Sequence, residues 1–266
     1  MVLKDKYAML SFDVEEFDIP IEKGYNIPLS EQVKYSAEGL NIVIKLLRKY
    51  HIKATFFCTT NFALNANHII KILIEDGHEI ASHGCAHTYP QGKDIILSSQ
   101  LLKEQFSVEI HGYRQPRMMP IKMDMIRDVY KYDASLNPTI IPGRYMNHNK
   151  PRRIFMSGTV VEIPSSVTPY LRIPLFWLSL HHLPLCIYMW LVRKVLKNDG
   201  YFNTYFHPWE FIDLNKIPYK IPYIIRHNTG REMKQRLSSL IEMLLKEQVK
   251  FVTYHRMTQI WIDKLN

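Results

Sequence analysis

The chain has 266 residues, 47% of them hydrophobic and 22% charged, a balance typical of a soluble globular protein with a sizeable core. Its net charge of +9 fits a polyanionic partner, a membrane surface or an ordinary basic surface, but no dense Lys/Arg run with interleaved aromatic residues supports nucleic-acid binding. Three cysteines without C-x-x-C spacing argue against a disulfide framework, and the N-terminus lacks the apolar stretch of a signal peptide. We therefore expect a cytoplasmic protein.

Short apolar runs and helical patterns alternate along the first half of the chain. The runs predict strands at 7–13, 53–59, 78–82 and 112–116. The helical patterns lie at 36–50, 63–76, about 94–108 and 122–132. Such alternation predicts an α/β fold with a parallel sheet covered by helices.

The second half is less regular. A proline-rich insertion covers about 134–198 and contains a predicted strand pair around "RIFMSG" and "TVVEIPS". A strand at 201–207, a helix at 230–248 and a strand at 250–255 follow. No composition shift marks a linker, so we expect a single domain over 1–266.

Residues 171–198 form the longest apolar region, but two prolines and a His-His pair interrupt it. It does not predict a membrane-spanning helix. Residues 185–198 predict an amphipathic helix with basic residues near its end. This helix either packs on the fold, or forms a flap at the active site, or lies on a membrane surface. The sequence leaves the oligomeric state open.

Polar residues follow the predicted strands at one edge of the sheet. They are Asp13, Glu15, His83, His87, Arg114 and His207. In parallel α/β folds, the carboxyl edge of the sheet carries the functional residues. Four strands that end in this way predict a functional site.

His83 and His87 are four positions apart, a spacing that brings two imidazoles to one face of a helical turn. With a carboxylate they predict a metal site that leaves positions for water and substrate. Zinc is the first choice for hydrolysis, with iron, cobalt and manganese as alternatives. Asp13 and Glu15 lie on one side of the strand pleat, so one can bind the ion while the other takes a proton from water. The acids after residue 14 can also be a solvated loop.

The motifs "SFDVEE", "SHGCAH", "GYRQPRMMP" with "YKYDASL", and "YFHPWEF" resemble, in order and spacing, those of the polysaccharide deacetylases, carbohydrate esterase family four. The resemblance runs from residue 7 to about 255 and is strongest to a branch with D-V-E and H-P-W-E variants. It implies a distorted, incomplete (β/α) barrel. It also implies a metal-dependent hydrolase that removes an N-acetyl group from an amino sugar.

The resemblance also implies residue roles. Asp13 matches the catalytic base, His83 and His87 the metal-binding histidines, Arg114 the arginine that orients the base, and His207 the general acid. Val14 stands where the family's usual second aspartate binds the metal. We therefore expect Glu15 to be the ligand, with Glu16 and Asp18 as possible substitutes.

Three further residues are candidates for substrate binding. Arg117 stands where the family usually has small or aromatic residues, Trp209 can stack on a sugar or pack in the core, and Glu162 can face the site from its strand pair. The substrate is an N-acetylated sugar of a polysaccharide or of its nucleotide- or lipid-linked precursor. One alternative is a carbon–nitrogen hydrolase for a cyclic amide or ureide, and another is a catalytically silent carbohydrate-binding relative.

Overall fold

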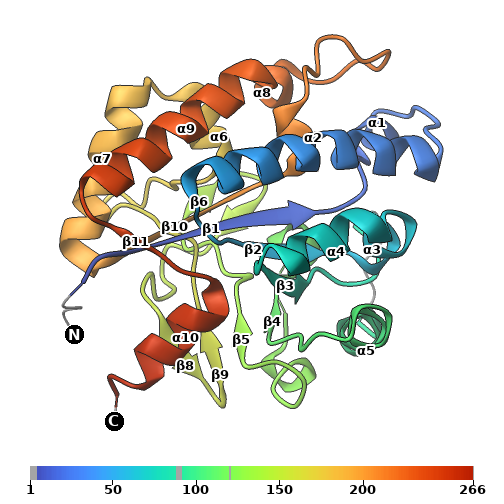
Figure 1. The fold of residues 1–266 in the computed structure, drawn as a ribbon. Helices are drawn as coiled ribbons and strands as arrows, with labels where there is room; N and C mark the ends of the chain where they lie inside the picture. The colour runs from blue at the N-terminus through green and yellow to red at the C-terminus, as the bar shows by residue number, and fades with distance from the viewer. Residues whose placement is uncertain (1–4, 88–91, 120, 266) are drawn as a thin grey trace.

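The computed structural model describes residues 5–87, 92–119 and 121–265. One curled sheet organises the chain (Figure 1). Its strands pair in the order β10 (Tyr201–Phe206), β1 (Tyr7–Val14), β2 (Thr55–Cys58), β3 (Glu79–Ser82), β4 (Gly112–Tyr113), β5 (Tyr132–Asp133), β9 (Val160–Glu162) and β8 (Phe155–Ser157), with β11 (Lys250–Phe251) also on β1. All pairs are parallel except β8–β9. The predicted α/β class and incomplete barrel are confirmed.

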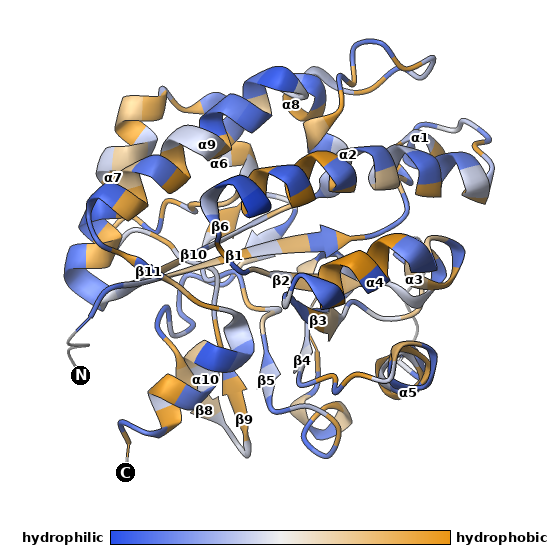
Figure 2. Cartoon of the chain, viewed as in Figure 1, coloured by the Kyte–Doolittle hydropathy of each residue, from blue (hydrophilic) through white to orange (hydrophobic). Residues whose placement is uncertain are grey.

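Helices surround this sheet, and the last of them packs Tyr254 and Met257 against Met9 on its inner face. The helices are α1 (Ile19–Glu22), α2 (Leu29–Tyr50), α3 (Thr60–Asn65), α4 (Asn67–Glu75), α5 (Asp94–Phe106), α6 (Trp177–His182), α7 (Leu185–Asp199), α8 (Tyr223–Arg226), α9 (Arg231–Lys246) and α10 (Tyr254–Ile262). Figure 2 shows hydrophobic and hydrophilic residues alternating along α2, whose inward positions Leu40, Val43 and Leu47 recur at helical spacing. That apolar stripe is why the helix packs on the sheet.

Strand β1 is paired on both sides, by β10 and by β2. Leu10 and Phe12 face the helix-covered core, whereas Met9 faces the inside of the curled sheet. Since side chains alternate along a strand, Asp13 shares the inner face with Met9. The strand therefore delivers a carboxylate to the inside of the half-barrel.

Several predicted element boundaries differ from the structure. The predicted helix over 122–132 is wrong, because this segment forms a short 3-10 helix at Met123–Met125, a series of turns and then strand β5. The predicted helix over 63–76 is divided at Ala66, and the last predicted strand ends at Phe251 before α10 begins. Local periodicity did not reveal these breaks, because tertiary pairing decides them.

The irregular insertion contributes to both the sheet and its cover. It contains a small hairpin of β6 (Ile140–Ile141) and β7 (Tyr145–Met146), then the antiparallel pair β8–β9 predicted from the sequence. Helix α7 buries Tyr188, Val192 and Val195 against the core. Among the helices in the described ranges, none combines the length and apolar character that crossing a bilayer requires.

Candidate active site

The predicted polar residues converge at the carboxyl edge of the sheet. Asp13 lies near the end of β1, and Glu15 follows that strand. His83 follows β3, Arg114 follows β4 and His207 follows β10. Neighbouring parallel strands end side by side, which is why residues far apart in the sequence meet here. They line one cavity of about 280 Å³, except for Arg114, which lies buried behind Asp13.

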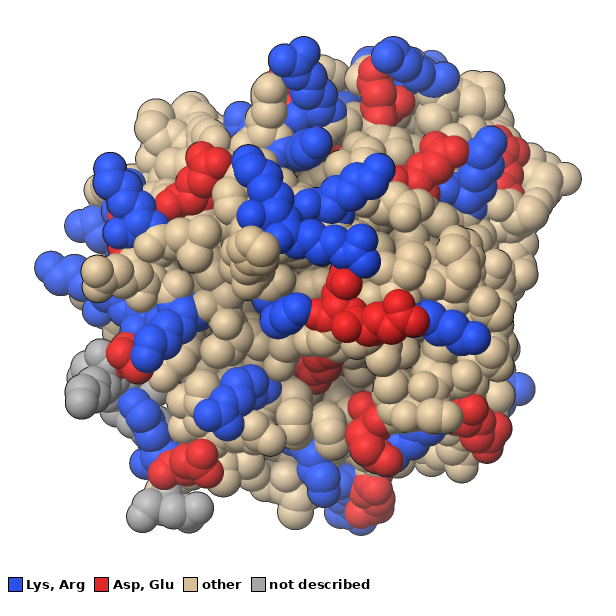
Figure 3. Space-filling model, in the orientation of Figure 1, with Lys and Arg blue, Asp and Glu red and all other residues tan. Residues whose placement is uncertain are grey.

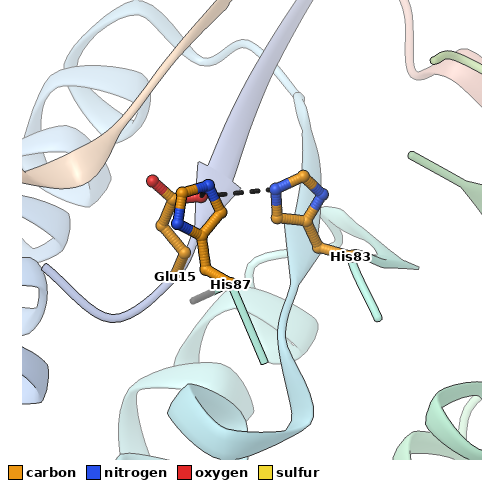
Figure 4. A group of neighbouring side chains, drawn as sticks. All are labelled: Glu15, His83 and His87. Atoms are coloured by element: carbon orange, nitrogen blue, oxygen red, sulfur yellow. Dashed lines mark ion pairs between the residues drawn. The ribbon is translucent and has the colours of Figure 1, made fainter. Parts of the chain in front are cut away.

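Glu15, His83 and His87 form the centre of this site (Figure 4). Glu15 Oε2 lies 3.3 Å from His83 Nε2 and 3.1 Å from His87 Nε2. One ligand atom from each residue lies within 4.8 Å of the other two, and all three residues are buried. Among the described residues, Glu15 Oε2 has no hydrogen-bond partner.

The outer nitrogens of both imidazoles are held by acceptors. His83 Nδ1 lies 2.8 Å from the carbonyl oxygen of Arg114, and His87 Nδ1 lies 2.9 Å from Asp18 Oδ2. Each Nδ1 therefore carries a proton, and each ring turns its Nε2 toward Glu15, where a deprotonated Nε2 offers a lone pair. Three lone pairs that converge in a buried space fit a divalent cation.

The geometry also separates the acids that the sequence left as alternatives. Glu16 accepts a hydrogen bond from Thr59 at 2.7 Å and is not among the residues that line the cavity. Asp18 holds the outer nitrogen of His87 and pairs with Arg117 at 3.2 Å. Glu15 is thus the acid that faces both inner nitrogens, and Asp18 orients one of the rings.

Protons compete with a cation for the same lone pairs. Burial lowers the pKa of His87, but the carboxylates of Glu15 and Asp18 outweigh burial and raise this pKa to about 9. For Glu15, burial raises the pKa, and the nearby histidines reverse the effect and lower it. Glu15 is therefore ionised when it faces the two rings.

Asp13 is held by a buried arginine. Arg114 Nη1 donates to Asp13 Oδ1 at 2.5 Å and to Ser11 Oγ at 3.0 Å, and its guanidinium lies 4.0 Å from the centre of the Phe57 ring. Burial raises the pKa of Asp13, but the charge of Arg114 and the neighbouring histidines lower it further than burial raises it. The carboxyl group is therefore ionised and fixed in direction, as a general base requires.

His207 follows β10, the strand that pairs with β1, and faces Glu15. Its Nε2 lies 3.9 Å from Glu15 Oε1, and its Nδ1 lies 2.8 Å from Glu210 Oε1. Burial lowers the pKa of His207, whereas Glu15 and Glu210 raise it above the ordinary value. A protonated Nε2 at the cavity is the state that a general acid needs.

The three candidate substrate-binding residues have different surroundings. Arg117 lines the cavity and pairs with Glu22 as well as Asp18. Trp209 also lines it, and one face of its ring is stacked on His207 with centroids 4.6 Å apart. Glu162 does not line this cavity. It lines a separate one of about 340 Å³ with Asp133, where burial raises the pKa of both carboxyls.

Sequence reasoning missed two residues behind the cavity. Glu210 stands three positions after His207 and reaches it through the 3-10 helix η3 (Pro208–Phe211), a spacing that could have indicated the contact. His181 contacts Glu210 from α6, and nothing in its sequence spacing signals this. Trp177, one turn earlier on α6, packs edge-on against His207 with centroids 5.1 Å apart.

The comparisons agree with the motif pattern. Residues 3–117 match the family model of polysaccharide deacetylases, and residues 134–260 match a domain of unknown function, DUF3473. Together with the fold, the first match defines a deacetylase-type hydrolase whose candidate site lies at the carboxyl edge of a curled, mostly parallel sheet. Residues 3–117 of the chain belong to the polysaccharide deacetylase family.

Individual relatives are distant. The chain is 30% identical over 108 residues to a peptidoglycan deacetylase of Helicobacter pylori, a match that covers 37% of each protein and so only about a third of that relative. A putative polysaccharide deacetylase from Mycobacterium smegmatis shares the fold at a TM-score of 0.65 and 17% identity, over 97% of this chain and 92% of that one. The allantoinase PuuE shares it at a TM-score of 0.63 and 16% identity, over 96% and 89%.

Proposed function

We propose that this protein hydrolyses the N-acetyl group of an amino sugar in a polysaccharide or in its nucleotide- or lipid-linked precursor. The observation that carries the proposal is the convergence of His83 Nε2 and His87 Nε2 on the buried Glu15 Oε2, which has no hydrogen-bond partner in the described part of the chain. An ionised Asp13 and a proton-bearing His207 line the same cavity. The family and the Helicobacter relative support the amide of an acetylated sugar as the substrate.

Glu15, His83 and His87 would hold a divalent ion, which we propose to be zinc, with iron, cobalt and manganese as alternatives for this donor set. When bound, such an ion supplies Lewis acidity that polarises a carbonyl and acidifies water. Asp18 and the Arg114 carbonyl orient the two imidazoles for this task.

The residues around the cluster would move the protons. Asp13 accepts a proton from the attacking water, because Arg114 keeps it ionised and aimed. His207 gives a proton from Nε2 to the leaving amine, because Glu210 holds the other ring nitrogen. Apolar walls that include Phe176, Trp177 and Ile141 limit the access of bulk water to the cavity.

A paired measurement tests this proposal. The purified protein is analysed for bound metals and then screened for acetate release from N-acetyl amino sugars, their nucleotide-linked forms and chito-oligosaccharides. We expect metal binding and acetate release from at least one class. Metal binding with ring opening of a cyclic ureide, and without acetate release, would instead support an activity like that of the allantoinase. If the protein neither binds metal nor releases acetate, that result would support the alternative of a catalytically silent binding protein.

We also propose that the protein works in the cytoplasm and touches a membrane surface through α7. All three cysteines are free, which suits a reducing compartment. The outward face of α7 carries Ile187, 46% exposed, and Trp190, 54% exposed, and Lys194 lies 5.1 Å from the centre of the Trp190 ring. Apolar side chains followed by cations suit an anionic lipid interface. On the face seen in Figure 3, basic and acidic side chains are interspersed.

A further inference from the structure

Glu210 lies between two histidines in the wall behind the active-site cavity. Its Oε1 accepts from His207 Nδ1 at 2.8 Å and from the His207 backbone N–H at 2.6 Å. Its Oε2 lies 2.9 Å from His181 Nε2. Glu210 and His181 are each 0% exposed, so solvent does not replace either contact.

The partner of His181 Nδ1 bears on which nitrogens of this ring carry protons. His181 Nδ1 lies 2.7 Å from the carbonyl oxygen of His227, and a carbonyl oxygen only accepts hydrogen bonds. Both ring nitrogens therefore face oxygen atoms, and opposite an ionised Glu210 a ring with a proton on each nitrogen donates to both. A positively charged His181 then forms a charge-assisted hydrogen bond with Glu210.

Helix α6 carries, besides His181, a second residue that packs against His207. Trp177 and His181 are four residues apart and so lie on one face of the helix. The Trp177 ring packs edge-on against His181, with centroids 5.5 Å apart, and against His207, with centroids 5.1 Å apart. Asn228 Nδ2 donates to the His181 carbonyl at 2.7 Å and holds the helix in place.

We propose that His181 is a positioning residue for the acid, acting on His207 through Glu210. Without the His181 donor, a buried carboxylate oxygen is left without a partner, and the side chain of Glu210 loses one of the two rings that fix its direction. The Nδ1–H contact of His207 then loosens, and Nε2 is no longer held toward the leaving group. The proposal rests on the proposed function for the reaction that the acid serves.

The leaving group separates this role from a merely structural one. A sugar amine must be protonated as it leaves, whereas the 4-nitrophenolate of 4-nitrophenyl acetate leaves without a proton. We expect His181→Leu to lower kcat for the N-acetyl sugar by about 10-fold or more, and to change the ester rate by less than about 3-fold. His181→Gln, which keeps one donor, should fall between wild type and His181→Leu.

His182→Leu is the matched control, because His182 neighbours His181 on the same helix and is exposed. It contacts only the Ile224 carbonyl and nearby rings among the described residues, so both rates should stay near wild type. Equal losses on amide and ester in His181→Leu, or no loss on the amide, would overturn the positioning role.

A second measurement does not depend on activity. In metal-free protein labelled with 15N-histidine, NMR should show protons on both ring nitrogens of His181 and on Nδ1 of His207. His181→Gln should shift the His207 Nδ1–H resonance, while His182→Leu should not. A single ring proton on His181, or an unchanged His207 resonance, would refute the proposal even if His181→Leu failed to fold. Absence of amide hydrolysis by wild type with this NMR pattern intact would instead refute the proposed function.

Discussion

Glu15 shows how much of the site depends on single atoms. Its Oε2 faces two imidazole nitrogens whose outer partners are already fixed by Asp18 and the Arg114 carbonyl. The sequence indicated an acid in this stretch and two histidines four positions apart. It left Glu15, Glu16 and Asp18 as alternatives, because side-chain direction after the end of a strand is not encoded by spacing.

Removing either histidine should remove the ion. His83→Ala or His87→Ala leaves two of the three proposed ligands, so we expect metal content after dialysis to fall by at least about 10-fold. Elemental analysis of the purified variants measures this. His68→Ala, at an exposed position on α4, is the control and should keep its metal. Full metal occupancy in either site variant would show that the ligand assignment is wrong.

Replacing Asp13 should separate chemistry from metal binding. Asp13→Asn keeps the size of the side chain and a contact to Arg114 but cannot accept a proton from water. Acetate release should fall by about 10² or more with metal content unchanged. Turnover near that of wild type would exclude Asp13 as the base. The exposed Asp128→Asn variant controls for the loss of one negative charge.

At the scale of elements, α2 fixes the position of η3, the turn that carries Trp209 and Glu210. The helix approaches this turn so closely that a Cβ on Gly39 would lie 1.8 Å from the Pro208 carbonyl oxygen. Backbone atoms cannot yield to such a contact without moving the turn. The sequence predicted a helix over this region, but the need for glycine at this position arises only from the packing.

We therefore expect Gly39→Ala to affect both stability and activity. Because η3 must shift, the free energy of unfolding should fall by about 1–3 kcal/mol, although alanine favours helix more than glycine does. Acetate release should fall more than the folded fraction does, since Glu210 moves with η3. Denaturant unfolding and activity assays measure the two effects. Asn41→Ala, exposed on the same helix, should change neither, and a stabilised Gly39→Ala protein would contradict this packing.

Helix α7 carries the proposed membrane contact on its outward face. Trp190→Ala removes the largest exposed apolar group of this face, so sedimentation with anionic phospholipid vesicles should decrease at least about 3-fold. Neutral vesicles should bind little of either protein. Ile262→Ala on α10 is the control for loss of an exposed apolar group elsewhere. Equal sedimentation of wild type and Trp190→Ala would remove α7 as the contact.

At the scale of the whole molecule, a histidine far from the site links folding to pH. His78 is buried below strand β3, where its Nδ1 accepts from the Ala54 backbone N–H at 3.2 Å. Burial and the charge of Lys53 lower its pKa to about 4 from an ordinary value of 6.5. The unfolded chain therefore binds this proton more readily than the folded chain as the pH falls.

The sign of the effect follows directly. His78 should reduce the free energy of unfolding as the pH drops from about 6.5 to about 4, by at most about 3 kcal/mol, and by nothing further below that window. His78→Asn keeps an acceptor near Ala54 but does not titrate. As the pH falls through this window, the free energy of unfolding of His78→Asn, measured in urea, should rise relative to that of wild type. A constant difference between pH 7 and pH 4 would show that His78 does not destabilise the protein in acid.

The sequence by itself determined the α/β class and the sheet edge at which polar residues gather, and the resemblance of its motifs to a known family implied the incomplete barrel. Local alternation of strands and helices carries this information, and parallel strands place their carboxyl ends side by side. Only the tertiary structure decided that Glu15 faces the histidines, that Glu162 lies in another cavity, and that His181 reaches Glu210. These contacts depend on side-chain directions and on the packing of α6 against η3. Neither leaves a periodic signal in the chain.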